Sequence, residues 1–165
     1  AEKLGGREGP EWFAAFKRFL RKEDPWGDRP ELAASTFKRD MRKEGCTLLE
    51  DVEGPGDISI GNLELVPFLE GGERSINGEE LVRRARGKLR ANYGQRHAEY
   101  LLDHQTEIPE EFRKYYLVFT GTVWRDRGGE RHVAYLGWGG ERWHLRFSGL
   151  AYDFDSNGRV VRPRE

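Results

Sequence analysis

Basic side chains cluster in one stretch of the sequence, where Glu80 and Glu99 enclose six Lys and Arg residues and no further acid. In an α-helix, residues three or four apart lie on one face, so Arg83, Arg86 and Arg90 are predicted to form a row of guanidinium groups. Such a row binds polyanions, because a guanidinium stays charged and donates two parallel hydrogen bonds to a phosphate. The competing interpretation, which the low specificity of the pattern favours, is a solvated helix face whose arginines pair with acids from the more acidic first half of the chain.

A second cationic surface is predicted from the strict alternation in residues 142–147. In a β-strand, Arg142, His144 and Arg146 face one side, and the apolar residues between them face the other. Aromatic residues of adjacent strands would add surfaces that stack on unpaired bases or contact a protein partner. The predicted binding set therefore joins Arg142 and Arg146 to the helical arginines, with Trp124, Trp138 and Trp143 as partner-binding aromatics. The competing interpretation buries most of the five tryptophans in the core.

The four histidines support a hypothesis from another class, a small metal-dependent hydrolase or nuclease. His97 and His104 lie two helical turns apart, about 10 Å along the axis, which is too far for both to bind one metal directly. A site would form only if a strand histidine and a carboxylate approached one of them in space. The candidate ligands are His97, Asp103, His104 and His144, with Glu99 and His132 as further candidates. Isolated histidines are more often structural, so we expect no metal and no cofactor.

One motif is similar to the start of a calcium-binding loop. Asp153, Asp155, Asn157 and Gly158 follow the pattern D-x-D-x-N-G, but Arg164 stands where such a loop has its closing glutamate. Asn-Gly is also the preferred pair for a tight turn between two strands, and strand-like residues flank it here. We therefore expect a β-hairpin and not a calcium site.

Composition restricts the function classes further. The chain has 165 residues, with 28 basic and 29 acidic side chains and a net charge of −1, which is unlike a strongly basic nucleic-acid-binding protein. It contains no GxGxxG, no GxxxxGK[ST] and no GxSxG. Its apolar runs are too short to cross a bilayer, no secretory signal is visible, and the single Cys46 indicates a reducing compartment. We expect a cytoplasmic protein that does not associate with membranes.

The elements that must position these residues begin with two predicted helices in residues 1–45. Apolar residues at spacings of three and four follow Pro10, and a second such pattern runs from Pro30 to a stop at Gly45. Together they predict an N-terminal helical hairpin, after which short strand-like pieces continue to Leu69.

The rest of the chain is predicted to hold two central helices and a sheet. The helical pattern begins after Ser75 and continues, with one interruption, to Ile108. Beyond Arg113 the apolar pattern changes to a period of two, in runs separated by glycine pairs and by Asn157-Gly158. The predicted fold class is α+β, with a C-terminal antiparallel β-meander of about four to five strands.

Part of the sequence resembles a group of short bacterial proteins to which no activity is assigned. The resemblance is carried by His97–Gln105, Ile108–Arg113 and Val118–Trp124, and it extends through Arg162. It implies a recurring bacterial domain and carries over no site, cofactor or partner. The first 45 residues lie outside it, so we expect a helical segment of residues 1–45 beside an α+β domain of residues 46–165, or one single domain.

These observations favour a non-enzymatic interaction domain that uses its C-terminal sheet and basic helix. A protein partner is favoured over a nucleic acid, because the net charge is near zero and the basic surface is only local. The alternative is the metal-dependent hydrolase or nuclease built from the histidines. A homodimer is also considered, because edge strands of the predicted sheet can pair between two copies.

Overall fold

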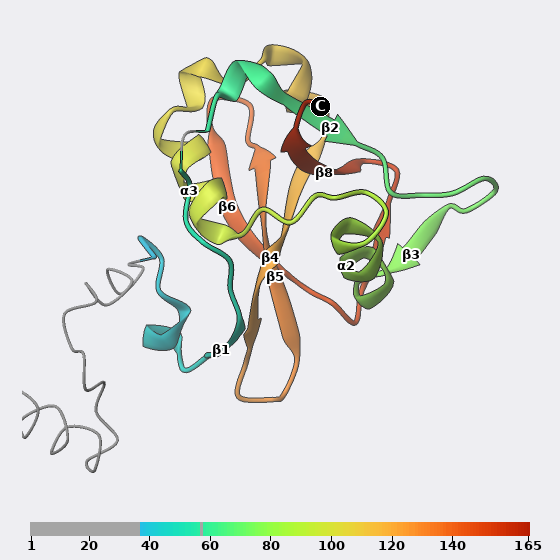
Figure 1. Ribbon diagram of the computed structural model, residues 1–165. Helices are drawn as coiled ribbons and strands as arrows, with labels where there is room; N and C mark the ends of the chain where they lie inside the picture. Colours follow the sequence, from blue (N-terminus) through green and yellow to red (C-terminus); the bar gives the residue numbers. More distant parts are fainter. Residues whose placement is uncertain (1–36, 57) are drawn as a thin grey trace, which may run out of the picture. The chain divides into compact units, whose positions relative to one another are not determined.

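A six-stranded sheet organises the part of the chain that the structure describes (Figure 1). The computed structural model describes residues 37–56 and 58–165, and Phe37–Glu165 form one compact unit. Five strands follow the order β2-β8-β4-β5-β6, and β1 pairs with the second half of β4. All neighbours are antiparallel except β4 and β8, which are parallel. The strands are β1 (Thr47–Glu50), β2 (Leu63–Val66), β4 (Tyr116–Arg125), β5 (Arg131–Trp138), β6 (Trp143–Gly149) and β8 (Gly158–Pro163).

Shorter elements complete the unit. Strands β3 (Ser75–Asn77) and β7 (Asp153–Asp155) pair in a separate two-stranded sheet. The α-helices of the described residues are α2 (Gly78–Arg86) and α3 (Gln95–Asp103). Short 3₁₀ helices lie at Met41–Glu44, Ile60–Asn62, Gln105–Glu107 and Glu110–Lys114. None of the helices in this part of the chain is long and apolar enough to cross a membrane.

The register of the large sheet sorts its side chains onto two faces. Val118 lies opposite Tyr135, and Tyr135 lies opposite Arg146, so these three side chains share one face. The other face carries the aligned row Leu117, Leu136 and Leu145. The register therefore shows the predicted alternation for residues 143–147, whereas Arg142 lies just before the strand.

Two helices pack on opposite sides of this sheet, as Figure 1 shows. Leu81 and Ala85 of α2 belong to one apolar core with Val118, so we call that side of the sheet the α2 face. Ala98 and Leu101 of α3 belong to a second core with the leucine row, on what we call the α3 face. Because both faces are covered, β4 is buried along nearly its whole length.

The helix ends follow from local hydrogen bonding. The Asn77 side chain accepts a hydrogen bond from the backbone N–H of Glu79 at 2.9 Å and caps α2. At α3 the cap is Gly94, whose N–H donates to Nδ1 of His97 at 3.0 Å. Both helices fall within the stretch that the sequence predicts as helical.

The predicted arrangement of the whole chain is nevertheless wrong, although α+β is broadly right. The described residues hold eight strands in two sheets and only two α-helices, so this part is richer in sheet than predicted. The first predicted helix and the start of the second lie outside the described residues. The end of the second is not α-helical: Asp40 caps a single 3₁₀ turn, Met41–Glu44, which stops at Gly45 with φ of 85°.

The C-terminal meander is wrong for a topological reason. Strands β4, β5 and β6 follow one another as predicted, but β7 then leaves to pair with β3, and β8 returns between β2 and β4. Strands β7 and β8 therefore do not form the hairpin predicted at Asn157-Gly158. The physical cause is burial, because Phe154 of β7 packs in the α2-face core while Val160 and Val161 of β8 are buried on opposite faces.

Candidate functional site

A cleft of about 370 Å³ lies between α3 and β6. Leu102 of α3 and Leu145 of β6 give it apolar walls, and charged or polar groups stand around them. The full lining is Lys38, Arg39, Glu99, Leu102, Gln105, Arg142, Trp143, His144 and Leu145. The cleft thus combines three apolar side chains with six polar or charged ones, so it can contact both apolar and charged groups of a ligand.

Strand β6 forms one side of this cleft and is an edge strand. In the described residues it pairs only with β5, so its outer edge has no strand neighbour there. At one end, the side-chain oxygen of Gln105 accepts a hydrogen bond from the backbone N–H of Trp143 at 3.0 Å. This contact takes the place of a neighbouring strand for one backbone group only.

A buried polar network fixes the opposite wall. The Glu99 carboxylate is 4% exposed and accepts hydrogen bonds from the backbone N–H groups of Lys38 (2.9 Å) and Arg39 (3.1 Å). The Gln95 amide donates to Glu99 at 2.9 Å and to the Arg39 carbonyl at 2.6 Å, and it accepts from the Trp124 indole at 2.7 Å. The partners satisfy a carboxylate that would be costly to bury alone. Sequence reasoning missed this role of Gln95 and Glu99, although their i, i+4 spacing is a helical signal.

Cationic side chains surround the cleft and β6. Lys38 pairs with Asp103, and Arg39 pairs with Glu44 at 3.3 Å while its guanidinium lies 5.2 Å from the Phe147 ring centre. Arg142 and Arg146 are exposed and form no ion pair within the described residues. These two predicted residues thus remain available to an acidic ligand.

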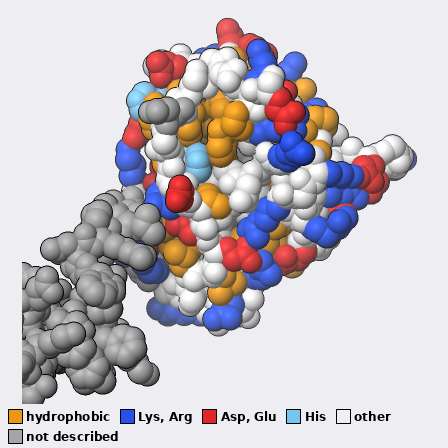
Figure 2. Space-filling model, viewed as in Figure 1, with side chains coloured by type: hydrophobic (Ala, Val, Ile, Leu, Met, Phe, Trp, Pro, Cys, Tyr) orange, Lys and Arg blue, Asp and Glu red, His pale blue; other side chains and the backbone are white. Residues whose placement is uncertain are grey.

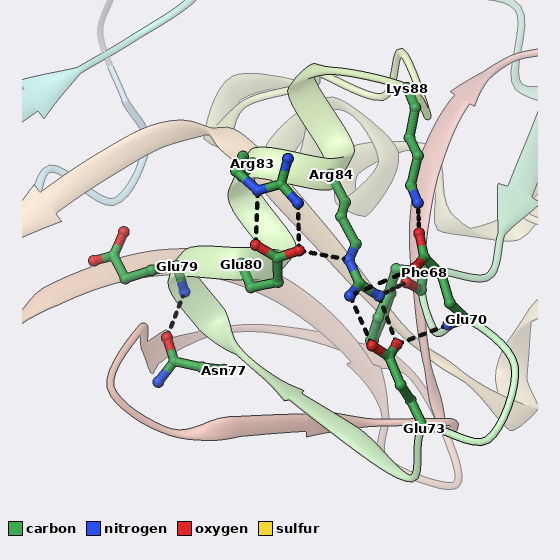
Figure 3. Close-up of polar contacts among 9 residues, drawn as sticks. All are labelled: Phe68, Glu70, Glu73, Asn77, Glu79, Glu80, Arg83, Arg84 and Lys88. Carbon is green, nitrogen blue, oxygen red and sulfur yellow. Dashed lines mark hydrogen bonds and ion pairs between the residues drawn. The ribbon is translucent and has the colours of Figure 1, made fainter.

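The arginines predicted to form one helical row are placed differently, and the row itself is wrong, because α2 ends at Arg86 and Arg90 lies beyond it with a φ of 50°. Arg83 pairs with Glu80 at 2.6 Å, Arg86 pairs with Glu50, and Arg90 lies 3.8 Å from Glu165. The neighbouring Arg84 turns inward, as Figure 3 shows, and binds the acidic residues Glu73 and Glu80 and the Phe68 carbonyl. Figure 2 likewise shows red and blue side chains interspersed. The arginines predicted to bind polyanions therefore have carboxylate partners in the chain, but only Glu50 lies in its first half, where the competing interpretation expected them.

Two of the three predicted partner-binding aromatics are buried and do not lie at the surface. Trp124 and Trp143 are 0% and 2% exposed and belong to the core, so they are not surface anchors. Trp143 packs in the α3-face core, and Trp124 packs with Phe37 and Met41 in a third core. Trp138 is only half-buried, but the Arg113 guanidinium lies 4.0 Å from its ring centre.

The predicted histidine ligands do not converge. His97 is buried at the start of α3, Nδ1 of His104 lies 2.8 Å from the Tyr100 carbonyl, and His144 lines the cleft. Asp103 pairs with Lys38. Among the described residues, the set that could hold a metal ion is instead Asp126, Glu130 and His132 at the β4–β5 turn.

That set also has a structural explanation. Asp126 Oδ2 lies 2.9 Å from Nε2 of His132, and Oδ1 accepts the backbone N–H of Glu130 at 2.9 Å. The hydrogen bond with His132 and those from the turn lower the pKa of Asp126. The sequence signal was present as D-x₃-E-x-H around Gly128-Gly129, which sequence reasoning did not use.

Comparisons of the chain with protein-family models, with curated proteins and with solved structures find no match. The function is therefore argued from the geometry alone.

Proposed function

We propose that this chain is a non-enzymatic binding domain that holds an extended, acidic segment of a protein partner along β6. The observation that supports the proposal is the combination of an edge strand, a cleft beside it and two exposed arginines, Arg146 on β6 and Arg142 immediately before it. An extended peptide can add to a sheet edge through main-chain hydrogen bonds, while alternate side chains enter neighbouring pockets.

The two sides of β6 define the sequence that such a peptide needs. Side chains on one side of an added strand would lie over the α2 face, beside His144 and Arg146. Those on the other side would enter the cleft between Leu102 and Leu145. We therefore expect a partner segment in which acidic and apolar residues alternate.

A nucleic acid fits this surface less well. The cleft walls are apolar, the net charge of the chain is −1, and the α2 arginines already have carboxylate partners. Affinity for a nucleic acid grows with the number of phosphates that Lys and Arg neutralise, and in the described residues β6 and the position before it offer only Arg146 and Arg142 outside ion pairs.

The experiment uses a fluorescent peptide in which glutamate and valine alternate, followed by fluorescence anisotropy. We expect binding to the full chain, and Arg142→Glu combined with Arg146→Glu should weaken it by about tenfold or more. The matched control is Arg74→Glu, an exposed charge reversal in the loop before β3, which should leave the affinity unchanged. A peptide with lysine in place of glutamate should not bind.

A second probe tests the backbone contact. N-methylation of alternate peptide bonds removes the donors that strand addition requires, so this peptide should lose its affinity. Equal affinity of the methylated peptide, or no effect of the double charge reversal, would exclude β6 as the site. Preferential binding of a single-stranded oligonucleotide over the peptide would support a polyanion as the ligand instead. If the wild type forms a dimer and Arg142→Glu combined with Arg146→Glu abolishes it, the outer edge of β6 binds a second copy of the chain.

A further inference from the structure

A smaller hollow of about 200 Å³ lies on the α2 face of the sheet, on the opposite side from the cleft. Its lining is Tyr116 of β4, Tyr135 of β5, Ser148 of β6, and Asp153 and Phe154 of β7. Three of these five residues are aromatic, and the hollow plays no part in the function proposed above.

The rings enclose the hollow from different directions. The centroids of Tyr116 and Tyr135 are 5.9 Å apart with the rings inclined by 70°, and those of Tyr116 and Phe154 are 6.5 Å apart with an inclination of 52°. Aromatic faces carry partial negative charge, so a cation that lies within about 6 Å of several ring centres is attracted to each of them. Non-parallel walls suit a rounded cation better than a flat molecule.

Hydrogen bonds and close packing hold these rings in place. The Tyr116 hydroxyl donates to the Asp155 carboxylate at 3.2 Å and accepts from the Asp155 backbone N–H at 3.1 Å. Its ring lies directly against Gly158, where an added Cβ would come within 2.6 Å of it. Phe154 is buried at 3% exposure. The walls therefore need little ordering when a ligand binds, which favours affinity.

The charge of the lining is negative. Asp153 is exposed at the hollow and accepts a hydrogen bond from the Ser75 hydroxyl at 3.3 Å, and the lining includes no Lys, Arg or His. Burial raises the pKa of Tyr116 to about 12, so its phenol stays neutral at physiological pH. Arg146, the cross-strand neighbour of Tyr135, is not part of the lining.

We propose that this hollow binds a methylated ammonium group. Such a group is a weakly hydrated, rounded cation whose methyl groups pack against aromatic rings while its charge meets their faces and the Asp153 carboxylate. A plain ammonium is bound less well, because it is strongly hydrated and must give up water, while the Tyr116 hydroxyl is already hydrogen-bonded to Asp155.

Choline is the probe, and its neutral carbon isostere 3,3-dimethyl-1-butanol is the matched ligand control. Titration followed by two-dimensional NMR should show shifts around Tyr135 and Phe154, with choline binding roughly tenfold tighter than the isostere. Tyr135→Leu keeps an apolar wall but removes the ring, and Asp153→Asn removes the charge. Each should weaken choline binding several-fold without changing binding of the acidic peptide to β6.

Tyr152→Leu is the protein control, because Tyr152 is 63% exposed and adjacent in sequence but outside the lining. It should leave choline binding unchanged. Equal affinity for choline and the isostere would overturn the proposal, as would choline binding that is insensitive to both Tyr135→Leu and Asp153→Asn. Absence of any choline-dependent shift in the folded chain would also overturn it.

Discussion

His97 is a histidine that its surroundings keep neutral. Its ring stacks on Tyr93 with centroids 4.2 Å apart, and its Nδ1 accepts the Gly94 N–H at the start of α3. Burial and the charge of the adjacent Arg96 lower its pKa to about 4. The residue therefore caps the start of α3, which is a structural role and not that of a metal ligand.

We expect acid to destabilise the fold through His97. An unfolded chain protonates this residue near pH 6.5, whereas the folded chain does so only near pH 4, so between these values the unfolded state binds more protons. This contribution to stability is complete above pH 6.5 and falls as the pH is lowered towards 4. His97→Gln keeps a side-chain acceptor for Gly94 and should reduce the difference in melting temperature between pH 7 and pH 4.5.

Circular dichroism melts measure that difference. His144→Gln, at a half-buried histidine of the cleft, should keep the wild-type dependence on pH. Identical pH profiles for the wild type and His97→Gln would show that the neutral imidazole of His97 contributes nothing to acid sensitivity.

At the scale of elements, α2 is joined to the loop before β3 by one guanidinium (Figure 3). Arg84 is 6% exposed and donates to Glu73 at 2.6 and 2.8 Å, to Glu80 at 2.8 Å and to the Phe68 carbonyl at 3.0 Å. Hydrogen bonds from Arg83 and Arg84 lower the pKa of Glu80 to about 2. Removing Arg84 would leave the Phe68 carbonyl and Oε1 of Glu73 without this donor, whereas Glu80 would keep its hydrogen bonds from Arg83.

Arg84→Met should therefore lower the melting temperature by roughly 5 °C or more, because it keeps the apolar stem but removes every donor. Arg83→Met is the matched control on the same helix, since Arg83 is largely exposed and shares the acceptor Glu80. It should lower the melting temperature by less than about 2 °C. Differential scanning calorimetry compares the two, and equal losses would contradict a special role for the inward arginine.

The contrast between Arg83 and Arg84 shows how much of α2 and its contacts the sequence could predict. The cap at Asn77 and the apolar positions of α2 are local signals, and they locate the helix. Whether an arginine turns inward depends on Glu73 in a loop eleven positions away, and no periodicity encodes that contact. The same limit applies to the candidate site, because Arg142 and Arg146 follow from strand alternation, whereas the buried Gln95–Glu99 network depends on distant residues.

At the scale of the whole molecule, β8 decides the topology. It is parallel to β4 and antiparallel to β2, and its Val160 and Val161 are buried on opposite faces of the sheet. From sequence, the run 159–162 is recognisable as a strand, but adjacency along the chain predicts pairing with its predecessor. Packing contacts between residues that are far apart in the sequence place β8 between β2 and β4.

Deletion of residues 158–165 should therefore abolish cooperative unfolding, because it removes an inner strand and separates β2 from β4. Deletion of residues 164–165 removes only the part beyond β8 and should leave a cooperative transition with a nearly unchanged midpoint. Urea denaturation followed by tryptophan fluorescence distinguishes the two. A sigmoidal transition in the longer deletion would show that β8 is dispensable.

From the position of β8 we also expect an order in which the strands pair as the chain folds. The β4–β5–β6 hairpins close over short loops, whereas β8 must enter a slot between strands that are far from each other in sequence. A chain in which β8 has not yet docked leaves one edge of β2 and one edge of β4 open. It therefore has more backbone N–H and C=O groups without a partner than the native state has. The species most prone to aggregate is therefore one in which the hairpins are formed and the slot is empty, and conditions that speed the docking of β8 will raise the yield of folded protein.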